Sequence, residues 1–477
     1  MLDEQCKGLY QSLSVFAGGF TLEAAEAVCC DKQIADLDVL NGIESLLDKS
    51  LLYREENVTG EPRFHMLETI REYGIERLEE KEEAAYCRDQ HSNFFLELAE
   101  TAEPKLNGSE VKQWLDRLEL EHDNFRESIR WYAISNQVES LLRLCCSLGS
   151  FWQMRGHLTE GRDKLQNALA RADKDLTKLK AKGLLLHCEL AYYQSDYEEA
   201  LKSGEECLSI YESSEDQDGE ALASNRIGWI HYRLSNFDLA TEYFTNARDM
   251  ATQINNQLTI GMADLGIGLI NWRARKTEEA KSLFEKSLKI FSDLGVPKRK
   301  AESLGNLGLI TRQEGNLKKA IWYHEQAAFI KEEIGDMVTI RRTYNNLGDI
   351  YALLGDYEKA ILYYERLQKL AQQTADDKYL NWAYAGLAEA KLAIGENDDA
   401  MEYIQKSMQL ASKIGKDDEI GVCYRVLGDI MLARDRIGEA KECFEKSVSL
   451  LKDIEDQEEL AKAQKGIEKS LAMQHKK

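Results

Sequence analysis

The segment GDYEKAILYYERLQ, residues 355–368, decides the fold because variants of it recur along the chain. YEEALKSGEECL (197–208), FDLATEYFTNAR (237–248) and IGEAKECFEKSV (437–448) are three further copies. One alanine returns at intervals of forty residues, as Ala200, Ala240, Ala280, Ala320, Ala360, Ala400 and Ala440. Self-similarity at a fixed period is the sequence signature of a repeat architecture.

Two further positions recur with the same forty-residue period, at fixed distances from the alanine. Twelve residues before it stands a small residue: Gly228, Gly268, Gly308, Gly348, Ala388 or Gly428. Four residues after it stands a bulky one: Phe244, Phe284, His324, Tyr364, Ile404 or Phe444. Apolar residues spaced at i, i+3, i+4 and i+7 indicate helices, and Gly315, Gly355 and Gly395 mark the turns between them. Each unit is therefore predicted to be a helical hairpin that buries its apolar face only by stacking on its neighbours.

This pattern resembles the tetratricopeptide repeat, whose usual period is about 34 residues, so the forty-residue period predicts longer helices. The resemblance implies an all-α fold, a right-handed α-solenoid. We expect eight units within residues 142–460, of which the first two are degenerate. Their bounds are 142–180, 181–220, 221–260, 261–300, 301–340, 341–380, 381–420 and 421–460. Residues 461–477 are predicted to form a capping helix.

The front of the chain does not repeat. Three helices are predicted, over residues 2–16, 21–30 and 37–50, with Thr21 as the N-cap of the second. Residues 50–56 and 62–67 alternate as a β-hairpin does, and a long helix is predicted to begin at residue 68. Three helices and a hairpin predict a small winged-helix domain over residues 1–80. Residues 81–141 would be a helical lead-in to the repeats.

The amino-acid sequence of this front region resembles that of a known family. LSVFAGGFTLEAAEAVC (13–29), GIESLLDKSLL (42–52) and RFHMLETIREYGIERL (63–78) are similar to the winged-helix segment of bacterial STAND-type signalling ATPases with an NB-ARC module. These are large regulators of the AfsR, MalT and LuxR-like type. WLDRLELEHDNFRESIRWY (114–132) and FWQMRGHLTEGRDKLQNAL (151–169) are similar to their helical lead-in. The chain thus looks like the C-terminal half of such a regulator.

The nucleotide-binding parts of that family are not found in the sequence. No GxxxxGK[ST] phosphate loop occurs. At the Met-His-Asp motif, whose histidine contacts ADP in the family, this chain has Met66, Leu67 and Glu68. Leu67 replaces the histidine, which puts that contact in doubt.

Charge and spacing argue against several classes of function. The formal net charge of −23 and the absence of Lys or Arg between Gln33 and Asp48, the predicted recognition helix, argue against direct DNA binding. No apolar run is long enough to span a membrane, and no signal peptide is evident, so a cytoplasmic protein is expected. Ten cysteines without a CxxC pair and eight histidines without metal spacing predict no metal, no cofactor and no enzymatic activity.

Repeat arrays usually bind ligands on the concave face, which the first helix of each hairpin lines. The residues predicted to line this groove combine aromatic rings with arginines, as binding hot spots often do. They are Asn225, Trp229, Arg233, Trp272, Arg273, Arg312, Arg342, Asn345 and Asp349. Because guanidinium groups suit carboxylates, the expected ligand is a protein or peptide, an acidic one included, or a small anionic effector. Replacing Arg233 and Arg273 with Glu is expected to abolish its binding.

Three functions remain open. The first is a non-enzymatic sensor and scaffold that passes ligand binding to an ATPase module in cis or in trans. The second is a stand-alone adaptor that joins two proteins. The third is a fragment of an active nucleotide hydrolase whose phosphate-loop module is missing from this sequence.

Overall fold

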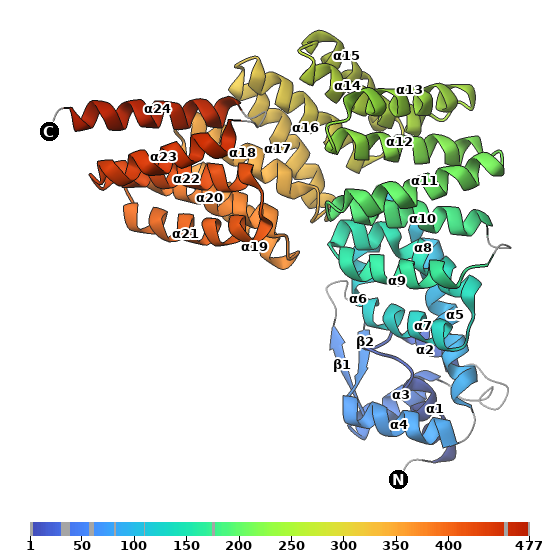
Figure 1. The fold of residues 1–477 in the computed structure, drawn as a ribbon. Helices are drawn as coiled ribbons and strands as arrows, with labels where there is room; N and C mark the ends of the chain where they lie inside the picture. Colours follow the sequence, from blue (N-terminus) through green and yellow to red (C-terminus); the bar gives the residue numbers. More distant parts are fainter. Residues whose placement is uncertain are drawn as a thin grey trace. The chain divides into compact units, whose positions relative to one another are not determined.

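The computed structural model describes residues 3–29, 39–56, 62–80, 83–108, 110–173, 177–452 and 457–475 (Figure 1). They form helices α1 to α24 and one two-stranded sheet, which confirms the predicted helical repeats behind a winged-helix domain. The chain divides into two units, and each is described by itself. Unit 1 comprises Met1–Ile270 with Asp293–Val296, and unit 2 comprises Asn271–Ser292 with Pro297–Lys477. None of the described helices combines the length and the apolar character needed to cross a bilayer.

The winged-helix region of unit 1 contains the predicted elements. These are α1 (Glu4–Leu13), α2 (Leu22–Cys29), α3 (Val39–Asp48), β1 (Leu52–Glu56), β2 (Pro62–Met66) and α4 (Glu68–Glu80). Thr21 caps α2 as expected, because its Oγ1 accepts a hydrogen bond of 3.2 Å from the Ala24 N–H. The strands pair antiparallel with Leu52 opposite Met66, and Phe20 pairs with Phe64 in an isolated bridge. The predicted turn 57–61, residue 30 at the end of the second predicted helix and residues 37 and 38 at the start of the third lie outside the described residues.

A group of helices connects this region to the repeats. They are α5 (Ala84–Ala102), the 3₁₀ helix η1 (Glu103–Asn107), α6 (Val111–Leu120) and α7 (His122–Ile134). The single long helix predicted from residue 68 is wrong in its extent, since α4 is described to Glu80 and α5 begins at Ala84. Residues 81 and 82 lie outside the described part of the chain.

Helical hairpins follow in sequence order. Their helices are α8 (Val138–Arg155), α9 (Leu158–Arg171), α10 (Thr177–Tyr193), α11 (Tyr197–Ser213), α12 (Gln217–Arg233), α13 (Phe237–Gln253), α14 (Gln257–Arg273), α15 (Thr277–Asp293), α16 (Pro297–Gln313), α17 (Leu317–Ile334), α18 (Ile340–Leu353), α19 (Tyr357–Gln373), α20 (Asp377–Ala393), α21 (Asn397–Ile414), α22 (Asp417–Ala433) and α23 (Ile437–Leu451). The last helix is α24 (Gln457–Gln474), which packs on α22 and α23.

The turns repeat as strictly as the helices. The turn inside a hairpin holds one residue with φ between +61° and +87°, at Ser195, Ser235, Arg275, Gly315, Gly355, Gly395 and Asp435. The turn between hairpins holds another with φ between +49° and +73°, at Glu215, Asn255, Gly295, Gly335, Ala375 and Gly415. The glycines predicted as turns are thereby confirmed, but other residue types occupy the same left-handed conformation.

The core is built from small and aromatic residues that interlock. The seven recurrent alanines are fully buried. Phe244 lies against two glycines, since a Cβ added at Gly228 or Gly266 would come within 2.8 Å or 2.5 Å of its ring. Tyr364 lies in the same way against Gly348 and Gly386. The missing side chains therefore make room for a ring between successive first helices, which explains the spacing of the repeat.

Candidate ligand-binding face of the repeats

The predicted groove residues all lie on first helices of hairpins, but in both units. Asn225, Trp229 and Arg233 lie on α12 in unit 1. In unit 2, the residues are Trp272 and Arg273 at the end of α14, Arg312 on α16, and Arg342, Asn345 and Asp349 on α18. The two groups are therefore considered separately.

In unit 1 the three predicted residues have different surroundings. Asn225 is fully buried, and neither its amide nitrogen nor its amide oxygen has a hydrogen-bond partner among the described residues. Trp229 packs edge-on against Phe244, with ring centroids 5.3 Å apart. Arg233 is exposed, and its Nε donates a hydrogen bond of 3.1 Å to the Tyr197 hydroxyl. Of the three, only Arg233 is exposed, and it is the only one that carries a charge.

In unit 2 the structure brings Arg312, Asn345 and Asp349 together. Asp349 Oδ2 accepts a hydrogen bond of 3.0 Å from Asn345 Nδ2 and lies 3.7 Å from Arg312 Nη1. Its Oδ1 accepts a hydrogen bond of 2.8 Å from the hydroxyl of Tyr364 on α19. Burial raises the pKa of Asp349, while Arg312 acts in the opposite direction. Burial followed by the Asp349 charge also holds the pKa of Tyr364 well above its ordinary value.

A second set of charges lies on the following first helices. Arg425 on α22 is almost fully buried and forms ion pairs with Glu389 of α20 and Glu459 of α24. It also lies 3.3 Å from Asp429. Lys462 Nζ reaches Glu459 at 2.7 Å. Burial acts to raise the pKa of Glu459, but Arg425 and Lys462 outweigh it and lower that pKa.

These two sets form one polar surface because α18, α20, α22 and α24 contact one another in succession. The charges of Lys462 and Glu459 act on Asp349, and that of Arg425 acts on Tyr364. We call this surface the unit 2 polar face. It consists of Arg312, Asn345, Asp349, Tyr364, Glu389, Arg425, Asp429, Glu459 and Lys462.

The other predicted residues of unit 2 are arranged differently. Arg273 and Arg342 are exposed, and Trp272 is half-buried with no hydrogen-bond partner for its indole Nε1 among the described residues. In the sequence, Tyr364 was singled out only as one of the recurrent bulky residues. Its period marks it as a core aromatic, and the hydroxyl that distinguishes it from Phe244 and Phe444 was the available signal for a polar role.

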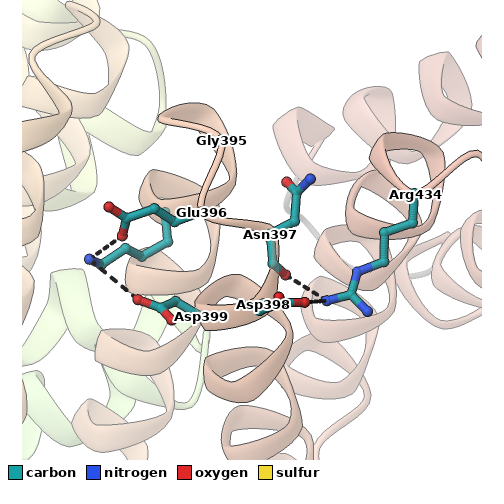
Figure 2. Close-up of a pocket in the computed structure, with 7 residues that line it drawn as sticks. Gly395, Glu396, Asn397, Asp398, Asp399 and Arg434 are labelled. Carbon is teal, nitrogen blue, oxygen red and sulfur yellow. Dashed lines mark hydrogen bonds and ion pairs between the residues drawn. The ribbon is translucent and has the colours of Figure 1, made fainter.

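A hollow of about 850 Å³ lies elsewhere in unit 2, at the turn from α20 to α21. Figure 2 shows that its charged groups are paired with one another. Lys391 contacts Glu396 at 2.5 Å and Asp399 at 3.7 Å, and Arg434 contacts Asp398 at 2.7 Å. The hollow contains none of the predicted groove residues, so it adds nothing to the groove.

Unit 1 contains a buried charged contact that the sequence did not reveal. Arg63 of β2 forms two hydrogen bonds, of 2.6 and 2.9 Å, with the carboxylate of Glu121, which lies between α6 and α7. It also donates to the carbonyl oxygens of Gly18, Gly19 and Leu120. Asn124 of α7 accepts from the Ala17 N–H and donates to Glu121 and to the Gly19 carbonyl.

We call Arg63, Glu121 and Asn124 the Arg63 hub. It joins the β-hairpin and the α1–α2 loop to the corner between α6 and α7. The sequence hinted at it only through two family-like stretches, 63–78, which begins with Arg63, and 114–132, which contains Glu121 and Asn124.

Comparisons with known proteins agree with this architecture. The winged helix-turn-helix family matches residues 2–79, and the tetratricopeptide repeat family matches residues 379–453. The soluble NSF attachment protein family matches residues 194–388. Proteins of Mycobacterium tuberculosis and Mycobacterium bovis that are named as HTH-type transcriptional regulators are 26% identical over 268 residues, or 54% of this chain. The chain covers only 30% of the length of these relatives.

Two solved structures share the fold. A STAND signal transduction ATPase with a tetratricopeptide repeat sensor from Pyrococcus horikoshii has a TM-score of 0.53 at 17% identity, over 100% of this chain and 64% of that one. A Rap protein in complex with competence and sporulation factor has a TM-score of 0.50 at 16% identity, over 81% of this chain and 99% of that one.

The chain thus combines a winged helix-turn-helix domain with a tetratricopeptide-type helical array. This combination confirms the resemblance of the sequence to the winged-helix and repeat part of STAND signalling ATPases.

Proposed function

We propose that this chain is a non-enzymatic sensor and scaffold whose repeats bind a protein or peptide ligand through their first helices. The proposal divides the chain into a winged-helix domain (1–80), a lead-in (81–141), eight repeats (142–460) and a capping helix (461–477). The ligand would be acidic or would present a chain terminus, since carboxylates suit the exposed guanidinium groups of Arg273 and Arg342 on the first helices α14 and α18.

The unit 2 polar face is the observation that carries the proposal. It gathers four carboxylates, two cationic groups of α22 and α24, and Arg312 on the side where repeat arrays usually bind. Apolar residues at these positions would stabilise the fold equally well, because the cost of desolvating the charges offsets much of the attraction between them. Stability alone therefore does not explain why the charges are there. The exposed Arg342 on α18 adds a cationic group in reach of solvent.

A peptide library with free carboxyl termini, displayed on phage and selected on the immobilised chain, tests this proposal. Affinities of the selected peptides are then measured by fluorescence anisotropy. The double variant Arg312→Glu/Arg342→Glu is expected to weaken binding at least about tenfold, because two charge-assisted contacts become repulsions. Higher salt should weaken binding to the unchanged chain as well.

The matched control is Lys318→Glu/Lys369→Glu, which makes the same change in charge on exposed positions of the second helices α17 and α19. Its affinity should equal that of the unchanged chain. If both double variants bind as tightly as the unchanged chain, a ligand face on the first helices of unit 2 is refuted. If both lose affinity to the same extent, the loss comes from overall charge and the face is refuted as well.

In the sensor function, ligand binding to the repeats is coupled to the winged-helix region. An ATPase module, in cis or in trans, would respond to the change. Such coupling requires that the ligand favour one of two states. The neighbouring STAND structure, which has a tetratricopeptide repeat sensor, supports this reading by fold alone. The alternative is a stand-alone adaptor, for which ligand binding would leave amide hydrogen exchange around the Arg63 hub unchanged.

A further inference from the structure

Three potential metal ligands meet at the junction between the lead-in and the first helical hairpin of unit 1. Glu119 lies in the last turn of α6, His122 begins α7, and His157 precedes the first residue of α9. Each offers one donor atom, and the three atoms lie within 4.8 Å of one another. No familiar metal spacing is present in the sequence, because His122 and His157 belong to different helical hairpins and only the fold brings them together.

The local backbone explains how the three side chains converge. Glu119 and His122 stand on either side of Glu121, the residue at which α6 ends and after which α7 begins. Gly156 ends α8 with φ +87°, and this left-handed turn places His157 opposite them. The imidazole rings of His122 and His157 lie with centroids 4.3 Å apart.

Hydrogen bonding within the cluster accounts for two of the three donors but not for His122. His157 Nε2 lies 3.0 Å from Glu119 Oε1, a distance that fits a hydrogen bond. The side chain of His122 is 8% exposed, and its Nε2 has no hydrogen-bond partner among the described residues. A buried polar atom without a partner costs free energy, so its presence requires an explanation.

A fourth donor stands beside the unpartnered nitrogen. Glu160 Oε2, from the first turn of α9, lies 3.5 Å from His122 Nε2. In a tetrahedral zinc site with bonds of about 2.0–2.1 Å, neighbouring donor atoms lie about 3.3 Å apart. The distances of 3.0 and 3.5 Å are therefore close to what one ion would require, and the donor atoms of Glu119, His122 and His157 all lie within 4.8 Å of one another.

The surrounding charges also fit a divalent cation. Glu119 and Glu160 supply two carboxylates beside the two imidazoles. Arg126 holds Glu160 through two hydrogen bonds of 2.7 and 2.6 Å and also contacts Asp123. Arg155 is paired with Asp116 and lies 3.9 Å from Glu119. Such outer partners orient metal-binding carboxylates in known sites.

We propose that Glu119, His122 and His157, with Glu160 as the fourth donor, bind a divalent transition-metal ion of the zinc type. Two imidazoles with two carboxylates select Zn²⁺ over Mg²⁺ or Ca²⁺, which prefer oxygen donors alone. The ion would fasten the α6–α7 corner to the α8–α9 turn. Because Glu121 and Asn124 flank His122, metal binding would also stiffen the part of the lead-in that holds the Arg63 hub.

The test uses the full chain, dialysed against EDTA and then titrated with Zn²⁺ by isothermal titration calorimetry. We expect one saturable site per chain. His157→Gln and Glu119→Gln should each weaken Zn²⁺ binding at least about tenfold. Both residues are partly exposed, so these variants should fold, which circular dichroism checks; His122→Gln is avoided because that side chain is buried.

His475→Gln is the matched control, since His475 is an exposed histidine near the end of the described chain. It should bind Zn²⁺ as the unchanged chain does. In hydrogen exchange, Zn²⁺ should slow the amides of residues 118–126 in the unchanged chain and not in His157→Gln. Absence of saturable binding, binding that survives both cluster variants, or equal affinity for Ca²⁺ would each overturn the proposal.

Discussion

Unit 1 is held together in two different ways along its length. Among the repeats, Phe244 is enclosed by Gly228 and Gly266, and the contact is apolar and shared between neighbouring hairpins. In the winged-helix region, the Arg63 hub joins residues 58 positions apart through a buried ion pair and carbonyl contacts. The first contact recurs every forty residues in variant form, whereas the second occurs at a single place.

The difference shows what each region can tolerate. An apolar contact between neighbours stabilises a small segment, and a stacked array adds such segments nearly independently. A buried charge pair stabilises little by itself but makes the loss of one partner costly, because the remaining charge stays desolvated. The repeats should therefore respond to volume, and the Arg63 hub should respond to charge balance.

Phe244→Ala is expected to give the largest loss of stability. Removing the ring leaves a cavity between two glycines that have no side chain to fill it, so the free energy of unfolding should fall by about 4 kcal/mol. Urea unfolding followed by circular dichroism measures the loss. Phe329→Ala, at a position that is 60% exposed on α17, should stay within about 0.5 kcal/mol. A similar loss in both variants would contradict the interlocking of the repeats.

Arg63→Met tests the other side of the comparison. It leaves Glu121 buried without its cation, and we expect a loss of about 3 kcal/mol in the free energy of unfolding of the winged-helix region. The double variant Arg63→Met/Glu121→Leu should recover most of this loss, because no unpaired charge remains. Among the repeats, by contrast, a second substitution that changes only side-chain volume should not restore the lost free energy of unfolding in this way.

The control pair is Arg71 and Glu68 on α4, whose side chains are 17% and 64% exposed, against 4% and 6% for Arg63 and Glu121. Arg71→Met should cost less than about 1 kcal/mol, as surface ion pairs do. If Arg63→Met costs no more than Arg71→Met, or if the double variant is worse than the single one, the charge balance of the hub does not determine stability.

The same contrast separates what the sequence predicted from what it did not. The hairpins, their turns and the place of Arg312, Asn345 and Asp349 on one face follow from a periodicity that any chain segment displays locally. The partners of those residues depend on side chains of neighbouring helices. Tyr364 reaches Asp349 from a second helix, and its hydroxyl is not part of the repeating pattern.

The contacts that do not repeat could not be predicted from the sequence, for a geometric reason. Arg63 meets Glu121, and His122 meets His157, only after several helices have packed, and no spacing rule links residues so far apart. The end of α4 at Glu80 was also missed, because the charged stretch that follows keeps a helical composition without an obvious stop signal.

His324→Phe sharpens the comparison by exchanging a polar core residue for the aromatic found at Phe244 and Phe444. His324 is fully buried without a hydrogen-bond partner among the described residues, and burial, followed by the charge of Lys331, lowers its pKa to about 3. The unfolded chain, with a pKa of 6.5, binds the proton first as pH falls. The stability that neutral His324 contributes is therefore fully present above about pH 6.5 and is lost as the pH falls from 6.5 to 3.

At pH 5.5 the protonation of this histidine in the unfolded chain should cost about 1 kcal/mol relative to pH 7.5. His324→Phe should remove that part of the pH dependence while leaving the rest, which His91 and His122 also cause through their lowered pKa values. Urea unfolding at the two pH values measures the difference. An unchanged slope in the variant would mean that His324 does not stay neutral in the folded protein.

Ala375→Gly addresses the smallest energy, the strain in the turns. Ala375 has φ +49° where Gly295, Gly335 and Gly415 occupy the corresponding turns. Relief of a left-handed conformation contributes about 1–2 kcal/mol, and the added freedom of glycine in the unfolded chain offsets about 0.4–1 of it. We expect a net gain of about 0.5 kcal/mol by urea unfolding. Gly415→Ala, at φ +73°, should lose stability by a similar or larger amount. If both substitutions stabilise, helix propensity outweighs turn geometry, and the turns are not what fixes the repeat.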